Sequence, residues 1–145
     1  MNLKIITNPL SLEIHGFSGT ALNKDYAGTA FKLMDKMWQV VKANGLPHKG
    51  KNIWVYESNE KVFAGVELRA VPKDGIGLEQ KSVVLNKYAY YKHIGPYNLI
   101  KQAGQNMRTE LEENGFKHQL PYIEIYGHWT NDESKLETEL LMGIQ

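Results

Sequence analysis

The stretch of sequence that decides the fold is PYIEIY, residues 121–126. Alternate side chains of a strand point to opposite faces, so the two tyrosines share one face with Glu124, while the two isoleucines share the other. One face of this strand is therefore aliphatic core, and the other face holds two phenols around a carboxylate. An edge strand with Glu124 in solvent would show the same letters, so the neighbouring segments decide between a buried and an exposed acid.

Length and composition indicate one folded domain over residues 1–145, because the chain is long enough for one core and too short for two. Seventeen Lys and Arg face sixteen Asp and Glu, for a net charge of +1, and the basic residues are scattered along the chain. Direct binding of nucleic acid is not expected from this pattern. The chain has no cysteine, which excludes disulfides and thiolate chemistry and suits a reducing compartment.

The apolar run within residues 1–9 is too short for a signal peptide, and no window approaches the length of a membrane span. We therefore expect a cytoplasmic protein that does not associate with membranes. Residues 1–9 are expected to form an irregular lead-in to the first strand.

The first half predicts a strand, a helix and a hairpin. Residues 10–19 alternate as a strand does. From an N-cap at Asn23 or Asp25, apolar residues recur at threes and fours until Asn44-Gly45, which indicates an amphipathic helix. Residues 53–56 and 62–68 then form two strands joined by a turn at residues 58–60.

The second half predicts the same order of elements after a linker at residues 70–80. Residues 82–93 are rich in strand formers, and Pro96 stands where a helix tolerates proline at its first position. An amphipathic helix follows and ends at Asn114-Gly115. Residues 122–126 and 136–142 supply the closing hairpin.

The two halves are also related residue by residue, because a single offset of 70 brings six identities into register. These are Met37 with Met107, Asn44 with Asn114, Gly45 with Gly115, His48 with His118, Ile53 with Ile123 and Tyr56 with Tyr126. The sequence therefore predicts a duplicated β-α-β-β unit, with repeat 1 at about residues 1–70 and repeat 2 at about residues 80–145. Such halves pack as an α+β domain, an antiparallel sheet with two helices on one side and pseudo-twofold symmetry.

A ligand cleft is predicted between the halves, where pockets are favoured. Trp54 of the first repeat corresponds to Glu124 of the second, and packing alone does not require an acid there. A carboxylate among aromatic rings suits a flat, lipophilic cation. The residues predicted to line this cleft are Glu124, Tyr126, Tyr122, Tyr56, Trp54, Phe63, Tyr90 and Trp38. Trp38 also fits the buried stripe of the first helix, which is the more common role for such a residue.

The second half resembles a known family in four segments: YKHIGPY at residues 91–97, the helix end at 113–115, PYIEIY at 121–126 and KLETEL at 135–140. It is similar to the GyrI-like small-molecule-binding family, which includes the effector-binding domains of AraC-type and MerR-type multidrug-responsive regulators. The resemblance implies a cleft for hydrophobic cationic aromatic compounds, with Glu124 as the counter-charge. No helix-turn-helix module is attached, which favours a stand-alone binder or sequestering protein.

Two alternatives follow from the same resemblance. Some family members resemble hydrolases that open the cyclopropane ring of alkylating natural products, and Glu124 would then be the acid-base residue. The family is also named for a DNA gyrase inhibitor, which would imply a protein partner. A homodimer through an edge strand is compatible with the sequence, although no residue specifies one.

Other chemistry has little support in the sequence. The five histidines lack ligand spacing with a nearby acid, so we expect no metal. The duplicated fold also resembles haem-binding SOUL proteins, but no histidine is singled out as an axial ligand, and we expect no cofactor. We interpret His93 and Tyr97 as structural residues at a strand end and a helix start.

Overall fold

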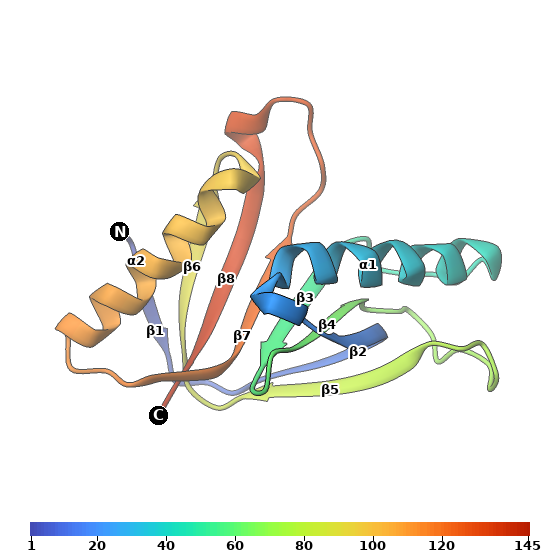
Figure 1. Ribbon diagram of the computed structural model, residues 1–145, viewed down its shortest axis with the longest axis horizontal. Coiled ribbons are helices and arrows are strands. Elements are labelled where there is room, and N and C mark those ends of the chain that lie inside the picture. The colour runs from blue at the N-terminus through green and yellow to red at the C-terminus, as the bar shows by residue number, and fades with distance from the viewer.

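The protein is described by a computed structural model that covers residues 1–145. Its elements are β1 (Lys4–Ile6), β2 (Leu10–Thr20), η1 (Leu22–Lys24), α1 (Tyr26–Ala43), β3 (Asn52–Glu57), β4 (Lys61–Val66), β5 (Glu79–Leu85), β6 (Tyr88–Ile94), η2 (Tyr97–Leu99), α2 (Ile100–Glu113), β7 (His118–Tyr126), η3 (Glu133–Lys135) and β8 (Glu137–Ile144). The fold is α+β, as predicted: one antiparallel eight-stranded sheet and two long helices (Figure 1). Neither helix combines the length and apolar composition that crossing a membrane requires.

The strands lie in the order β1-β6-β8-β7-β3-β4-β2-β5. Read from the β7–β3 junction outward, each strand of one half has a counterpart at the same distance in the other half. The first strand of each half lies at the edge of the other half of the sheet. β1 pairs with β6 of the second half, and β5 pairs with β2 of the first half. This exchange ties the halves together at both edges of the sheet, so the arrangement holds one more strand per half than the predicted β-α-β-β unit.

Local sequence explains both long helices. The Asp25 side chain accepts a hydrogen bond from the backbone N–H of Gly28 and caps the start of α1, as one of the two predicted N-caps. Both helices end at an Asn-Gly pair, and Gly45 and Gly115 adopt the left-handed conformation that suits glycine. The buried stripe of α1 includes Met37, and that of α2 includes Met107.

Three sequence predictions about the elements are wrong. Residues 1–9 are not all irregular, because β1 lies among them and pairs with β6. The linker predicted at residues 70–80 ends too late, because β5 already starts at Glu79, and the strand formers of residues 82–93 divide between β5 and β6 in different halves of the sheet. Pro96 is not the first residue of the helix, because the 3-10 turn η2 separates it from α2.

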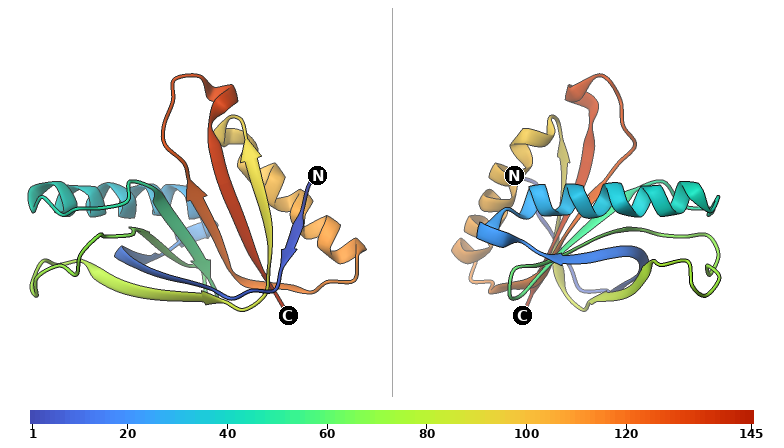
Figure 2. Two further views of the ribbon diagram at one scale, coloured as in Figure 1. Left: turned by 180° about the vertical axis from the view of Figure 1, so that it is seen from behind. Right: turned by 45° about the vertical axis from the view of Figure 1, so that its right-hand side comes forward.

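The two faces of the sheet bury different sets of side chains. On one face, α1 packs on β2 and β4, while α2 packs on β6 and β8, so both helices cover the same face. The opposite face holds ten buried strand residues from both halves and no helix residue. The sheet is strongly twisted, and its halves lie at a steep angle to one another (Figure 2). On the helix-free face of this curved sheet, side chains of the two halves pack against one another, and Ile123 is fully buried among them.

The close approach of β2 and β4 leads to a prediction about stability. Gly16 of β2 pairs directly with Gly65 of β4, and a Cβ at Gly16 would overlap the backbone carbonyl oxygen of Ala64. Because the obstacle is backbone, Gly16→Ala should lower the free energy of unfolding by about 1–3 kcal/mol or more, as overpacking does. Urea denaturation of the purified variant measures the change.

The matched control is Gly104→Ala in α2. Its Cβ would lie 3.5 Å from the Tyr122 hydroxyl, which is an ordinary contact. Replacing a mid-helix glycine by alanine should raise stability by up to about 1 kcal/mol. Equal midpoints for the wild type and Gly16→Ala would contradict the close approach of β2 and β4.

Candidate functional site

Glu124 lies at the centre of the sheet, because β7 pairs with β3 on one side and with β8 on the other. Its side chain is only 7% exposed and points to the face that the helices cover. The alternative of an edge strand with a solvated acid is therefore wrong. Trp54 of β3 is the direct cross-strand partner of Glu124.

Three tyrosine hydroxyls donate hydrogen bonds to the Glu124 carboxylate. Tyr56 and Tyr126 donate to Oε1 at 2.9 and 2.7 Å, and Tyr122 donates to Oε2 at 2.8 Å. We call Trp54, Tyr56, Tyr122, Glu124 and Tyr126 the carboxylate cluster. The cluster joins the halves, since Trp54 and Tyr56 come from β3 and the other three residues come from β7.

The charge of Glu124 has no cationic partner, because it forms no ion pair with any lysine, arginine or histidine. Its hydrogen-bond partners are three neutral hydroxyl groups, which compensate a buried charge less well than an opposite charge in direct contact. Burial, followed by the charge of Glu124, raises the pKa of the Tyr56, Tyr122 and Tyr126 phenols well above their ordinary value. Arg108 opposes this shift slightly at Tyr122. The cluster is thus one buried carboxylate that accepts hydrogen bonds from three neutral, partly buried donors.

The register explains why the two halves differ at this point. Trp54 and Glu124 are related by the 70-residue offset and also pair directly in the sheet. A twofold axis between the halves would therefore pass between these two side chains. Glutamate in both halves would place two buried carboxylates opposite one another, which is strongly unfavourable. One acid facing one tryptophan avoids that repulsion.

Aromatic rings from the start of each helix contact the cluster. Tyr26, the first residue of α1, packs edge-on against Tyr56 at 5.8 Å, and Tyr97 of η2 packs edge-on against Tyr126 at 5.6 Å. Phe31 packs edge-on against Trp54 at 5.3 Å. Phe31 is 54% exposed and Tyr97 is 40% exposed, so both rings also border solvent.

Sequence reasoning missed Tyr26 and Phe31 as neighbours of the site, and it assigned Tyr97 a structural role only. A signal was present, because Tyr26 and Tyr97 occupy nearly equivalent places at the starts of the two helical segments. His93 has the expected structural role, since its Nε2–H donates to the Pro96 carbonyl at 3.0 Å and holds the turn before Tyr97.

Three of the predicted cleft residues lie outside the cluster. Phe63 pairs with Val55 and is buried on the helix-free face. Tyr90 also packs on that face, where its hydroxyl donates to Glu139 at 2.7 Å. Their placement toward Glu124 was wrong, because strand pairing sets their faces. Trp38 stays on the helix side, but its indole N–H donates to the side chain of Asn52 at 2.6 Å.

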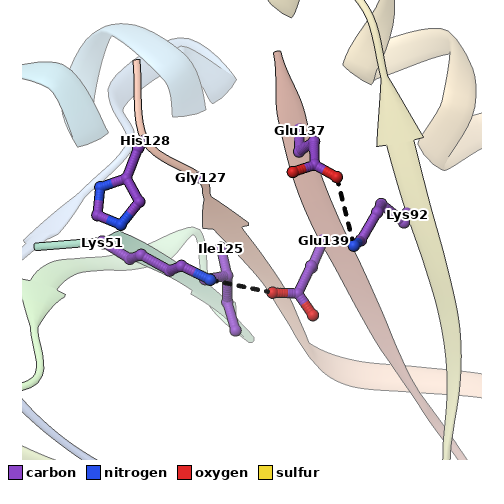
Figure 3. Close-up of a pocket in the computed structure, with 7 residues that line it drawn as sticks. All are labelled: Lys51, Lys92, Ile125, Gly127, His128, Glu137 and Glu139. Carbon is purple, nitrogen blue, oxygen red and sulfur yellow. Dashed lines mark ion pairs between the residues drawn. The ribbon is translucent and has the colours of Figure 1, made fainter. Parts of the chain in front are cut away.

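A separate cavity of about 140 Å³ lies at the far end of β7, on the helix-free side (Figure 3). Its charged side chains form two ion pairs, Lys51 with Glu139 at 3.9 Å and Lys92 with Glu137 at 3.4 Å. These four side chains are partly or largely exposed, so each ion pair contributes little to stability. No group of three or more His, Asp or Glu side chains is arranged to hold a metal ion.

The fold and the carboxylate cluster define an α+β domain with an aromatic-walled anionic site at the junction of its halves. Residues 19–145 match the GyrI-like small molecule binding domain, and the chain belongs to this family. A comparison with curated proteins gives no match.

Solved structures share the fold at low sequence identity. The EcmrR C-terminal domain matches with a TM-score of 0.75 and 18% identity, over 99% of this chain and 96% of that chain. SAV2435 bound to tetraphenylphosphonium matches with a TM-score of 0.66 and 15% identity, over 100% of this chain and 94% of that chain. A hydrolase from Listeria innocua matches with a TM-score of 0.56 and 12% identity, over 99% and 91%.

The buried phenols lead to a prediction about the pH at which the tyrosines ionise. Because folding raises the pKa of the three cluster phenols, their contribution to stability is complete below the ordinary tyrosine value of about 10 and declines as the pH rises above it. In the folded protein at pH about 11, phenolate absorbance should therefore account for clearly fewer than the eight tyrosines. The missing signal should appear when denaturant is added.

Tyr126→Phe provides the control for this titration, since it removes one phenol from the late group only. Ionisation of all eight tyrosines near pH 10 in the folded protein would show that the cluster is open to solvent.

Proposed function

We propose that this domain binds lipophilic aromatic cations at the carboxylate cluster. The observation that carries the proposal is a buried carboxylate that has three phenol donors and no cationic partner. A ligand cation would supply the missing opposite charge. The solved structure of SAV2435 bound to tetraphenylphosphonium supports this class of ligand, because tetraphenylphosphonium is a lipophilic cation with phenyl rings on its charged centre.

Each part of the cluster has a separate role in this proposal. Glu124 selects the sign of the charge, because a neutral or anionic ligand gains nothing from it. The rings of Trp54 and Tyr126, whose centroids lie 4.7 Å apart, offer faces for a cation at about 0.5–2 kcal/mol each. Burial of apolar ligand surface at about 25 cal/mol per Å² provides the larger share of affinity. This division of roles favours broad selectivity among cations of similar size.

Access to the cluster would be from the side of the helix starts. Phe31 of α1 and Tyr97 of η2 are the partly exposed rings above Trp54 and Tyr126. Exposed aromatic side chains change rotamer on a fast timescale, whereas the strands beneath are held by hydrogen bonds on both sides. Rotation of these two rings would open the site without distorting the sheet.

The role of Glu124 in selecting the charge of the ligand leads to a prediction about binding affinity. Glu124→Gln keeps the size of the side chain and removes its charge. It should weaken binding of a rhodamine-type cationic dye by at least about tenfold, and it should change the affinity for a neutral analogue of the same shape much less. Fluorescence titration with both dyes measures the two effects.

Glu139→Gln is the matched control, because Glu139 also accepts a tyrosine hydrogen bond but lies on the helix-free face. It should bind both dyes like the wild type. Equal weakening of the cationic and the neutral dye by Glu124→Gln would remove Glu124 from charge selection.

Hydrolysis of a strained ring remains an alternative hypothesis for the same residues. The solved hydrolase from Listeria innocua shares the fold, and Glu124 lies within hydrogen-bond distance of three phenols that can orient a substrate. Turnover separates the two hypotheses. With a cyclopropane-bearing alkylator in excess, a binder gives at most one ring-opened product per protein by mass spectrometry, whereas an enzyme gives many and loses them in Glu124→Gln.

A further inference from the structure

Within the carboxylate cluster, the indole N–H of Trp54 is the one buried polar group without a hydrogen-bond partner. The three phenols all donate to Glu124. The comparison with Trp38 is informative, because that indole N–H donates to Asn52 at 2.6 Å. Trp54 is only 5% exposed, so bulk water does not satisfy its N–H. Buried donors are almost always paired in folded proteins, which makes this exception informative.

The position of Trp54 connects this donor to the ligand site. Trp54 and Glu124 are direct partners across β3 and β7, and the side chains of such partners lie about 5 Å apart at Cβ. A ligand whose cationic centre lies beside Glu124 would therefore also lie near the Trp54 side chain. The Trp54 ring contacts both Phe31 and Tyr126, and these contacts restrict its rotation.

The chemistry of the donor limits what can pair with it. An indole N–H donates and never accepts, so its partner must be an acceptor such as a carbonyl, an ether oxygen or a ring nitrogen. Glu124 does not serve as this acceptor in the structure, because its oxygens accept only the three phenol hydrogen bonds and the Trp54 N–H has no partner. Glu124 of β7 therefore requires a positive charge on the ligand, and Trp54 of the neighbouring strand β3 requires a hydrogen-bond acceptor on it.

We infer that the preferred ligands of this site are aromatic cations that also carry a hydrogen-bond acceptor on one of their rings, and that Trp54 selects for this acceptor. The inference rests on the proposed function, since it specifies the ligand class of the same site. A purely hydrocarbon cation would satisfy Glu124 and leave the indole N–H unpaired. Providing the missing acceptor should improve affinity by about tenfold, as expected for completing a buried hydrogen bond.

The test uses five phosphonium probes of related shape. Tetraphenylphosphonium has no acceptor, the (acetylphenyl)triphenylphosphonium cations carry one carbonyl at the meta or para position, and the matching isopropylphenyl cations have the same bulk without an acceptor. Isothermal titration should show that the wild type binds one acetyl isomer about tenfold more tightly than its isopropyl match. Trp54→Phe, which removes the N–H and keeps an aromatic ring, should abolish this preference while the isopropyl cations still bind.

The indole N–H itself gives a second readout. The chain has three tryptophans, so the ¹H–¹⁵N spectrum should hold three indole resonances, and the one lost in Trp54→Phe should move downfield with the acetyl cation only. Trp129→Phe is the matched control, since Trp129 is 74% exposed in the segment between β7 and η3. It should keep the full preference for the acetyl cation.

The outcomes distinguish this inference from the proposed function. If the wild type binds all the cations without preference, or if Trp54→Phe keeps the preference, then water or ring contacts satisfy the indole and the inference is overturned, while cation binding stands. If none of the phosphonium cations binds, the proposed function is wrong and the inference falls with it. Binding of the isopropyl cation by Trp54→Phe shows that this variant is folded.

Discussion

One negative charge held inside the sheet by three hydroxyl groups is the constraint on which the rest of this structure depends. A carboxylate is costly to bury, and the cost is tolerated only when hydrogen bonds or opposite charges replace its water. Here Tyr56 of the first half and Tyr122 and Tyr126 of the second half supply those hydrogen bonds. The pairing of β3 with β7 is therefore both the junction of the two halves and the support of the site.

The symmetry of the sheet makes the single charge possible. The strand order is the same when read outward from β7 and from β3, and each half brings a tyrosine from the start of its helix against a tyrosine of its central strand. At the centre the symmetry is broken, since Glu124 faces Trp54 rather than a second acid. The result is an aromatic enclosure that is nearly symmetric around a site that has one charge and one unpaired indole donor.

The helix-free face explains how the site keeps its shape. Its core contains residues of both halves, among them Ile53, Val55 and Ile123, which alternate along β3 and β7 with the residues of the carboxylate cluster. Every cluster residue is thus fixed by a neighbour that is packed on the opposite side of the same strand. The strands are therefore already ordered without a ligand, and the side chains that can adjust are the exposed rings of Phe31 and Tyr97 at the helix starts.

The sequence by itself determined the local features of this protein. The alternation in residues 121–126 correctly separates the face of Glu124 from the face of Ile123, and the capping residues Asp25, Asn44 and Asn114 correctly bound the helices. The 70-residue offset also assigns Trp54 and Tyr56 to the positions in the first repeat that Glu124 and Tyr126 hold in the second, whereas the pairing of β3 with β7 that brings them together is tertiary. In each case the information lies within one strand, one helix end or one repeat.

Only the tertiary structure decided which residues from other strands and helices reach the site. Phe63 and Tyr90 face away because Phe63 pairs with Val55 and Tyr90 pairs with Leu141, and a shift of one residue would have reversed their faces. The contacts of Phe31 and Tyr97 with the cluster likewise depend on how the helix starts pack against the sheet. The physical reason is that strand register and helix packing are set by contacts between segments distant in the chain, and no local pattern encodes them.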